Sequence, residues 1–318
     1  MKIGNVQIKG KLILAPMCNI TDLPFRLLCK KYGAALTYSE MIFGDAYLQE
    51  SERSKKRAYF LEEERPIGIQ ITGTTTKKIV EASKKIEEEL NPDIIDINVG
   101  CPSYNVINSG GGGALLKHPE KLSDLVKKLC SSVKTPITCK IRLTDDLEKT
   151  IWLAKSIEKA GASALTVHGR TVKQKYSGKA DWNIIKKIKN ELKIPVILNG
   201  DVKDEESTKK ALTFSGCNAV MIGRAAIGNP YLFKRITHYL ETGQKLEKNL
   251  FRRIEIFEEY TKLCKKYGYE NLGKIKTVAE NLMKGFEGGA RIRKKISGAN
   301  SIIEIKKILE ENKDKRVI

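Results

Sequence analysis

Residues 94–103 read IIDINVGCPS, a stretch that joins a strand-like run to an abrupt stop. The run Ile94–Val99 is rich in β-branched apolar residues, which is typical of a parallel strand covered by helices. Pro102 has no N–H group to donate, so the strand cannot continue through it. Asn98 and Cys101 therefore lie where the strand ends. The cysteine on this turn is either an inert apolar residue or a reactive group.

Seven other runs share this character, and they are LILAP (12–16), LTYSE (36–40), IGIQITG (67–73), ITCKIRL (137–143), ALTVHGR (164–170), PVILNGD (195–201) and AVMIGRA (219–225). Segments with helical periodicity separate them, for example Leu122, Leu125, Val126 and Leu129. Eight β/α units in about 240 residues predict an α/β fold of the (β/α)8 TIM-barrel type. A doubly wound sheet is the alternative, although such a sheet rarely needs eight evenly spaced parallel units.

The β-rich runs stop near residue 244, and the remaining sequence has helical patterns over 251–267, 275–286 and 301–311. From Lys245 onward there are 19 Lys or Arg residues against 11 Asp or Glu residues, with a basic cluster at Arg291–Lys295. We therefore expect two domains, a barrel over 1–243 and a small helical domain over 244–318. Its basic character is typical of a module that binds a polyanion.

The whole chain of 318 residues carries a net charge of +20, which favours polyanionic partners without defining the fold. No apolar run reaches the roughly 20 residues of a membrane helix, and the N-terminus lacks the apolar core of a signal peptide. Seven scattered cysteines form no CxxC pair, which argues against a disulfide framework and against a structural zinc site. We expect a cytoplasmic protein with no bound metal, no membrane association and no stable protein partner.

Chemistry in a barrel gathers at the carboxyl ends of its strands. The polar and charged residues at the eight predicted ends are Met17, Cys18, Glu40, Gln70, Asn98, Cys101, Lys140, Arg142, His168, Arg170, Asn199, Asp201, Gly223 and Arg224. Any one of them is most simply explained as a partner for neighbouring backbone. Together they place cations, a thiol, amides and an imidazole at one mouth, which indicates an active site.

Two features of this mouth predict bound anions. Asn199-Gly200-Asp201 and Gly223-Arg224 end the seventh and eighth strands, where barrels often hold phosphate. Lys140 lies inside an apolar strand, where an ammonium needs an anionic or accepting partner. The glycine run 110–113 lacks the context of a nucleotide-binding loop, and we expect a mobile loop there instead.

In this order, the motifs resemble those of the tRNA-dihydrouridine synthase family, and its bacterial DusB-like branch most closely. The matching segments are LAPMCNITDLPFR (14–26), LTYSEM (36–41), QITG (70–73), DINVGCP (96–102), ALLKHP (114–119), CKIR (139–142), LTVHGRT (165–171), NGDV (199–202) and MIGRAAIGNP (221–230). The resemblance implies a flavoprotein oxidoreductase of tRNA processing. It would be a TIM barrel that holds FMN, takes electrons from NADPH or NADH, and grips tRNA with the helical domain 244–318.

The resemblance also implies roles for individual residues. The cofactor site would comprise Pro16, Met17, Cys18, Gln70, Lys140, His168, Asn199, Gly200, Asp201, Gly223 and Arg224. Asn98 and Arg142 would contact the uracil, and Cys101 would be the catalytic acid. Hydride would pass from N5 of FMN to C6 of a tRNA uridine, and a proton from Cys101 to C5, which gives 5,6-dihydrouridine. A cysteine thiol has an ordinary pKa of about 8.5, so it is mostly protonated at neutral pH, as a proton donor must be.

Two other functions remain open from the sequence. One is an FMN-dependent barrel oxidoreductase that acts on a free small molecule, as dihydroorotate dehydrogenases do. The other is a tRNA-binding protein without catalysis. The chain also departs from the family pattern, because Cys18 stands where Ala or Gly is common, and the segment after CKIR is short. These departures concern the tRNA contacts and a second thiol near the flavin.

Overall fold

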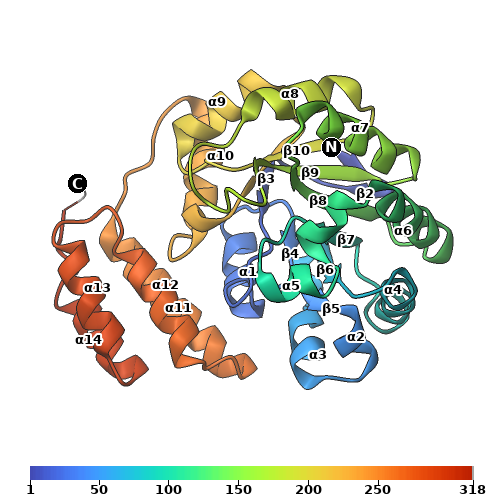
Figure 1. Cartoon of the computed structure of the whole chain (residues 1–318). Helices are drawn as coiled ribbons and strands as arrows, with labels where there is room; N and C mark the ends of the chain where they lie inside the picture. Colours follow the sequence, from blue (N-terminus) through green and yellow to red (C-terminus); the bar gives the residue numbers. More distant parts are fainter. Residues whose placement is uncertain (317–318) are drawn as a thin grey trace.

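The computed structural model describes residues 1–316, and its centre is a barrel of eight parallel strands (Figure 1). The strands are β3 (Leu12–Leu14), β4 (Thr37–Tyr38), β6 (Ile67–Thr72), β7 (Ile94–Val99), β8 (Ile137–Leu143), β9 (Ala164–Thr171), β10 (Val196–Asn199) and β11 (Ala219–Ile222). They follow one another around the ring in chain order, with β11 paired to β3. The predicted barrel is confirmed, and the doubly wound alternative is wrong.

The ring closes between β3 and β4 through a narrow seam. One residue pair, Ile13 and Leu36, forms the only bridge between these strands in the described residues. The backbone N–H of Ala35 donates to the carbonyl of Leu12 at 2.8 Å, and that of Leu14 donates to Leu36 at 2.9 Å. The other neighbours pair over longer stretches, such as the five residue pairs between β7 and β8.

Helices cover the outside of the barrel, and they are α1 (Leu23–Lys31), α4 (Thr76–Leu90), α6 (Pro119–Ser132), α7 (Leu147–Lys159), α8 (Trp182–Glu191), α9 (Glu205–Ser215) and α10 (Leu232–Thr242). Their starts follow from the sequence: the Asp204 carboxylate accepts from the Ser207 N–H at 2.8 Å and caps α9. Strand β4 is followed instead by the short elements β5 (Ile42–Phe43), α2 (Gly44–Leu48) and α3 (Glu52–Ala58), which the sequence pattern did not predict.

Residues along each strand alternate between the helices and the interior of the barrel. On β7, Ile95 and Ile97 pack in the cluster shared with the helices, whereas Ile94 packs in the inner cluster. The hairpin of β1 (Lys2–Ile3) and β2 (Val6–Gln7) adds Ile3 and Ile8 to that inner cluster. These two side chains lie against the first residues of the strands, so the hairpin closes the amino end of the barrel. The carboxyl end is left for polar residues.

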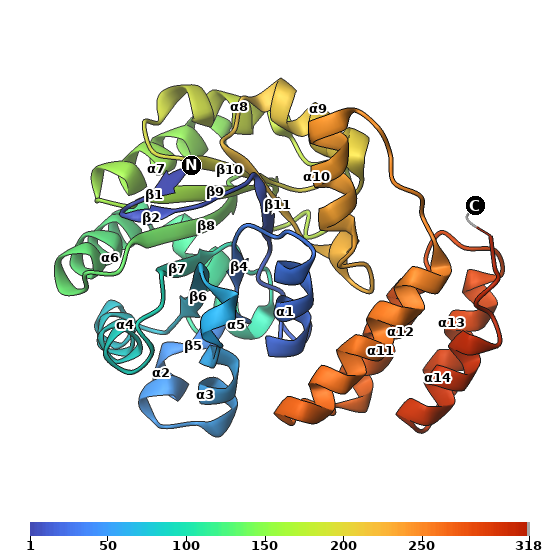
Figure 2. The same ribbon diagram turned by 180° about the vertical axis from the view of Figure 1, so that it is seen from behind.

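Four helices follow the barrel: α11 (Leu250–Tyr267), α12 (Leu272–Leu282), α13 (Gly289–Gly298) and α14 (Ile302–Glu310). They form a group beside α1, on one flank of the barrel (Figures 1 and 2). The sequence predicted three helices here and missed α13, because only Ile292 and Ile296 give it a repeating apolar face. The basic cluster Arg291–Lys295 lies on this helix.

Within residues 1–316, no helix combines the length and apolar character that a membrane crossing requires.

Candidate active site at the barrel mouth

Polar side chains fill the carboxyl end of the barrel because they occupy the inward-facing positions of their strands. In the sheet register Gln70 is opposite Asp96, Asn98 is opposite Lys140, and Asn199 is opposite His168. They therefore line one continuous surface across five neighbouring strands. The structure brings together these predicted residues from strands far apart in the sequence.

The turn that carries Cys101 is held by the side chain of Asn98. The Asn98 Oδ1 atom accepts hydrogen bonds from the backbone N–H groups of Gly100 (3.2 Å) and Cys101 (2.9 Å). The Cys101 carbonyl accepts from the Gly113 N–H at 3.1 Å. Cys101 is partly exposed, as a thiol that must meet a substrate needs to be.

The glycine run packs against this turn, and the expectation of a loop over 110–113 is wrong for its second half. Gly112 and Gly113 begin a 3-10 helix, η2 (Gly112–Lys117), and both are buried. Gly112 has a φ of +55°, and a Cβ placed on it would lie 3.0 Å from the Cβ of Cys101. The glycines allow η2 to lie directly against the cysteine.

Arg142 braces the same turn from β8. Its Nε donates to the Gly100 carbonyl at 2.9 Å, and its Nη1 donates to the carbonyls of Thr171 (3.1 Å) and Lys175 (2.7 Å). Its guanidinium carbon lies 5.6 Å from the ring centroid of Tyr176, and burial lowers its pKa. Within residues 1–316, Nη2 is the guanidinium nitrogen that donates no hydrogen bond to the protein.

Lys140 extends into the barrel with one hydrogen-bond acceptor among the described residues. Its Nζ donates to Asn199 Oδ1 at 3.1 Å, and Asn199 Nδ2 donates in turn to the Met221 carbonyl at 2.7 Å. Burial, with repulsion from Arg142, lowers the pKa of Lys140 to about 8. An ammonium in this position has donors left for an anionic ligand.

His168 is neutral in this environment. Burial is the largest cause that lowers its pKa, to about 2, and the surrounding cations lower it further. Those cations are Lys140, Arg142, Arg170 and Arg224. A neutral imidazole among four positive side chains marks a site with a strong preference for negative charge.

The ends of β10 and β11 offer backbone donors beside these cations. The N–H groups of Gly200, Asp201, Gly223 and Arg224 donate to no protein acceptor within residues 1–316. Gly200 has a φ of +114°, and a Cβ there would lie 2.8 Å from that of Ala180. Four free N–H groups on two adjacent turns offer a cradle for an anion, and the phosphate expected there stays a prediction.

The side chains of these two turns point to different partners. The Asp201 carboxylate accepts from Arg170 Nη2 at 2.7 and 2.9 Å and from the Ala180 N–H at 2.7 Å, so it organises the protein. Burial opposes its ionisation, but these hydrogen bonds keep its pKa below the ordinary value. Arg224 is exposed, with its guanidinium carbon 4.7 Å from the Tyr176 centroid.

The segment after β3 lies next to the Gly223 turn, because β3 pairs with β11. Pro16 and Met17 are partly exposed, and a Cβ on Gly223 would lie 3.6 Å from the Met17 sulfur. Cys18 is exposed at this edge, yet neighbouring groups shield its thiol from water and thereby raise its pKa. The charges of Glu40 and Cys101 also raise this pKa, whereas Arg57 lowers it.

A comparison with models of protein families identifies the family of this chain. The model described as "Dihydrouridine synthase (Dus)" matches residues 13–317, which is nearly the whole chain.

The chain belongs to the dihydrouridine synthase family.

Named relatives agree with this assignment. The tRNA-dihydrouridine synthase B of Vibrio vulnificus is 42% identical over 245 residues, which cover 76% of this chain and 76% of that protein. A probable tRNA-dihydrouridine synthase of Rickettsia conorii is 39% identical over 277 residues, covering 86% of this chain and 83% of that protein. Among solved structures, a 2-naphthoyl-CoA reductase complex aligns with a TM-score of 0.60 at 14% identity. That alignment covers 75% of this chain and 51% of that chain, and it shows the fold alone.

The residues of this dihydrouridine synthase fit a flavin with a terminal phosphate. The backbone cradle at β10 and β11 suits a phosphate, and Lys140 suits the polar edge of a flat ring. Gln70 is less free, because its Nε2 donates to Asp96 Oδ2 and its Oε1 accepts from Asn98 Nδ2, both at 2.8 Å. One N–H of Gln70 remains for a ligand.

Two residues beside the mouth were missed at the level of sequence. Asp96 is buried under Gln70, and Tyr176 lies between Arg142 and Arg224. A signal for Asp96 existed, since a charged residue inside an apolar strand is the same pattern that identified Lys140. Tyr176 had no such signal, because it lies in the connection after β9 and only the folded chain brings it to the mouth.

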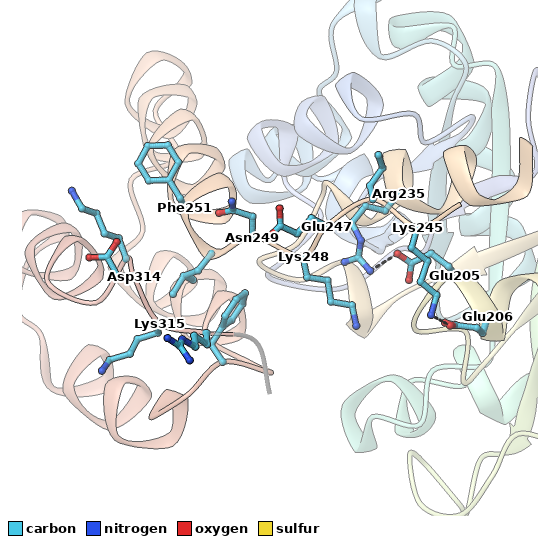
Figure 3. Close-up of a pocket in the computed structure, with 15 residues that line it drawn as sticks. Glu205, Glu206, Arg235, Lys245, Glu247, Lys248, Asn249, Phe251, Asp314 and Lys315 are labelled. Carbon is cyan, nitrogen blue, oxygen red and sulfur yellow. Dashed lines mark hydrogen bonds and ion pairs between the residues drawn. The ribbon is translucent and has the colours of Figure 1, made fainter. Parts of the chain in front are cut away.

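One cavity lies away from this mouth. It has a volume of about 690 Å³ and lies between the barrel and the C-terminal helices, both of which line it (Figure 3). The connecting residues Glu247, Lys248 and Asn249 lie between barrel residues and the C-terminal Asp314 and Lys315. Its charges are mixed, with Arg235 paired to Glu205 and Lys245 paired to Glu206. Among residues 1–316, no group of three or more His, Cys, Asp or Glu side chains is placed to hold a metal ion.

Proposed function

We propose that this dihydrouridine synthase reduces uridines of tRNA to 5,6-dihydrouridine, with FMN as cofactor and NADPH or NADH as electron source. The observation that carries the proposal is the placement of the Cys101 thiol on a braced turn, beside a mouth lined with cations and free N–H groups. Family membership supports the same reaction.

FMN, when bound, supplies the hydride that adds to C6 of the uracil ring. The protein residues supply binding, orientation and the proton. Gly200, Asp201, Gly223 and Arg224 would hold the phosphate, and Lys140 and His168 would also bind the cofactor. Pro16, Met17, Cys18, Gln70 and Asn199 complete the cofactor site.

Cys101 holds the transferable proton at Sγ and gives it to C5 of the uracil. Asn98 and Arg142 brace the turn that aims this thiol, and each retains an N–H toward the mouth for a uracil oxygen. The thiolate left after transfer regains a proton from solvent, so the protein returns to its starting state. Hydride and proton together add two hydrogen atoms across the C5=C6 bond.

The two parts of the chain divide this work. We assign catalysis to 1–243 and tRNA binding to 244–318, where α13 carries four of the basic residues. The target uridine leaves its stack to reach the mouth, which costs a few kcal/mol and is cheapest in loops. Seven unpaired cysteines suit a reducing compartment, and we place the reaction in the cytoplasm.

The test is to reduce the flavin anaerobically and to follow its absorption after mixing with tRNA that lacks dihydrouridine. We expect reoxidation by tRNA and none by free uracil or orotate. The variant Cys101→Ala slows this step by about 10²- to 10⁴-fold, since it removes the general acid. The matched control is Cys130→Ala, which removes a partly exposed thiol of α6 outside the proposed site and keeps a rate close to wild type.

Other outcomes would replace this function. Reoxidation by a free pyrimidine and not by tRNA would establish an oxidoreductase of small molecules. Protein that binds tRNA but cannot be loaded with flavin would be a tRNA-binding protein without this catalysis.

A further inference from the structure

We propose that Asp96 is a positioning residue for Cys101 and acts through a directional chain of hydrogen bonds that runs across three residues. The chain is Asp96, then Gln70, then Asn98, and it ends on the N–H groups of the cysteine turn. This inference deepens the proposed function and rests on it, because it assigns a role toward the proton donor of that reaction.

The chain starts at a carboxylate that can only accept hydrogen bonds. Asp96 is 1% exposed, with Oδ1 accepting from Thr138 Oγ1 at 2.7 Å and Oδ2 accepting from Gln70 Nε2 at 2.8 Å. Burial raises its pKa to about 6, while the two hydrogen bonds and the nearby Lys140 oppose that rise. At neutral pH the group is therefore mostly ionised, and it requires a donor from Gln70.

That requirement fixes the orientation of the next two amides. Once Nε2 of Gln70 faces Asp96, its Oε1 faces Asn98 and accepts from Nδ2 at 2.8 Å. Asn98 must then present Oδ1 to the turn, where it accepts from Gly100 at 3.2 Å and from Cys101 at 2.9 Å. A flip of either amide would set donor against donor at one contact and acceptor against acceptor at the other.

The presence of a carboxylate at the buried position 96 supports this directional role. The neighbours of Asp96 on β7 are Ile95 and Ile97, and a buried charge is more costly than an apolar or neutral residue of similar size. A neutral amide at position 96 would satisfy Thr138 as well, but it could orient Gln70 either way. The acceptor-only carboxylate at one end and the donor-only N–H groups of Gly100 and Cys101 at the other together commit the two amides to one arrangement.

The decisive variant is Asp96→Asn, which keeps the shape and removes the acceptor-only character. We expect anaerobic reoxidation of the reduced protein by tRNA to slow by about 10- to 100-fold, the usual penalty for a misplaced reacting group. Flavin reduction by NADPH or NADH does not use Cys101 and keeps its wild-type rate. The control Thr138→Val removes the other hydrogen bond to the same carboxylate and leaves the chain to Cys101 intact, so both half-reactions stay near wild type.

A second readout does not depend on turnover. Alkylation by iodoacetamide, resolved by peptide mass mapping with FMN present in all samples, gives the rate at Cys101 relative to the exposed Cys18. We expect this ratio to rise severalfold in Asp96→Asn and to stay at the wild-type value in Thr138→Val. If Asp96→Asn does not fold, Gln70→Met interrupts the same chain and carries the alkylation test.

The outcomes separate the two proposals. A wild-type ratio in Asp96→Asn, with both half-reactions slowed equally or neither slowed, would overturn the positioning role and leave Asp96 as a structural residue. A wild-type protein whose flavin is never reoxidised by tRNA would overturn the proposed function instead. In that case the alkylation ratio still decides whether the chain from Asp96 holds Cys101.

Discussion

Three buried ionisable residues inside the barrel, Asp96, Lys140 and His168, are held in environments that oppose their charged forms. Burial raises the pKa of Asp96 to about 6 and lowers those of Lys140 and His168 to about 8 and about 2. An interior selected only for stability would place apolar residues at such inward positions. Function is the reason to keep them, since active sites often reduce the stability of the protein that carries them.

Lys140→Met is expected to stabilise the protein freed of flavin while it abolishes turnover. The folded pKa of Lys140 lies below its unfolded value of about 10.4, so protonation favours the unfolded state. The ammonium therefore costs the native state about 1–3 kcal/mol at pH 7, and the variant gains that amount. The gain shrinks as pH rises from about 8 toward 10, because the native lysine is then neutral.

Urea denaturation of both proteins at pH 7 and at higher pH checks this prediction. The control is Lys134→Met, a change at an exposed lysine, which is expected to shift the free energy of unfolding by less than about 0.5 kcal/mol. A loss of stability in Lys140→Met at pH 7 would show that the ammonium is already well compensated in the folded protein.

For individual residues, the sequence predicted which of them line the mouth but not their hydrogen-bond partners. Lys140, Asn98 and Gln70 stood out because each is a polar residue within an apolar run. Strand alternation then predicts that they point inward. Their partners come from other strands, as Asn199 does for Lys140, and single-sequence patterns contain no information about cross-strand distances.

Among the elements, η2 is the one whose position bears most directly on the chemistry. It begins at Gly112, where a Cβ would lie 2.7 Å from Val106 Cγ1 and 3.0 Å from Cys101 Cβ. The helix and the cysteine turn are therefore packed without room for a methyl group. Residues that never touch a substrate can thus set the position of the thiol.

Gly112→Ala is expected to displace the Cys101 turn and to slow tRNA-dependent reoxidation more than about tenfold. The matched control is Gly110→Ala, since both glycines have positive φ but a Cβ at Gly110 meets only the Thr74 carbonyl, at 3.6 Å. In both variants the left-handed alanine lowers the free energy of unfolding by about 1–2 kcal/mol. In Gly112→Ala the steric overlap lowers it by about 1–3 kcal/mol more, which thermal denaturation measures. Equal rates in the two variants would mean that η2 does not position the thiol.

The same elements show how far sequence patterns reach. Long apolar runs between clear stops predicted all eight barrel strands, because parallel strands are buried on both faces. The two-residue strand β5 is too short to show any periodicity. The glycine run 110–113 predicts a loop because it lacks the context of a nucleotide-binding motif, and its packing against Cys101 depends on contacts that only the fold creates.

For the molecule as a whole, an ionic contact joins the C-terminal helices to the barrel mouth. Lys274 of α12 donates to Glu40 Oε1 at 2.7 Å, and Glu40 is 1% exposed at the end of β4. The other oxygen of Glu40 accepts from the Asn19 N–H at 2.8 Å and lies 3.1 Å from Arg57 Nε. One buried carboxylate thus holds the segment beside Cys18 and the helical part at the same time.

Lys274→Met is expected to lower the free energy of unfolding by about 1–3 kcal/mol, because Glu40 stays buried with one donor fewer. The control is Lys276→Met on the same helix, where Lys276 is partly exposed and donates to the Ser297 carbonyl at 2.8 Å. That change is expected to cost less than about 0.5 kcal/mol. If urea denaturation gives the same loss of unfolding free energy in both variants, the contact of Lys274 with Glu40 does not stabilise the protein more than an ordinary surface contact.

The seam between β3 and β4 is the place where the barrel is expected to open locally. A closed ring opens where the fewest bonds must break, and here two backbone hydrogen bonds join the strands. The segment Pro16-Met17-Cys18 follows directly from β3, so an opening of this seam would move one edge of the mouth. Amide deuterium uptake should therefore be fastest, among the barrel strands, at Leu14 and its neighbours, and binding of the cofactor should suppress it there first.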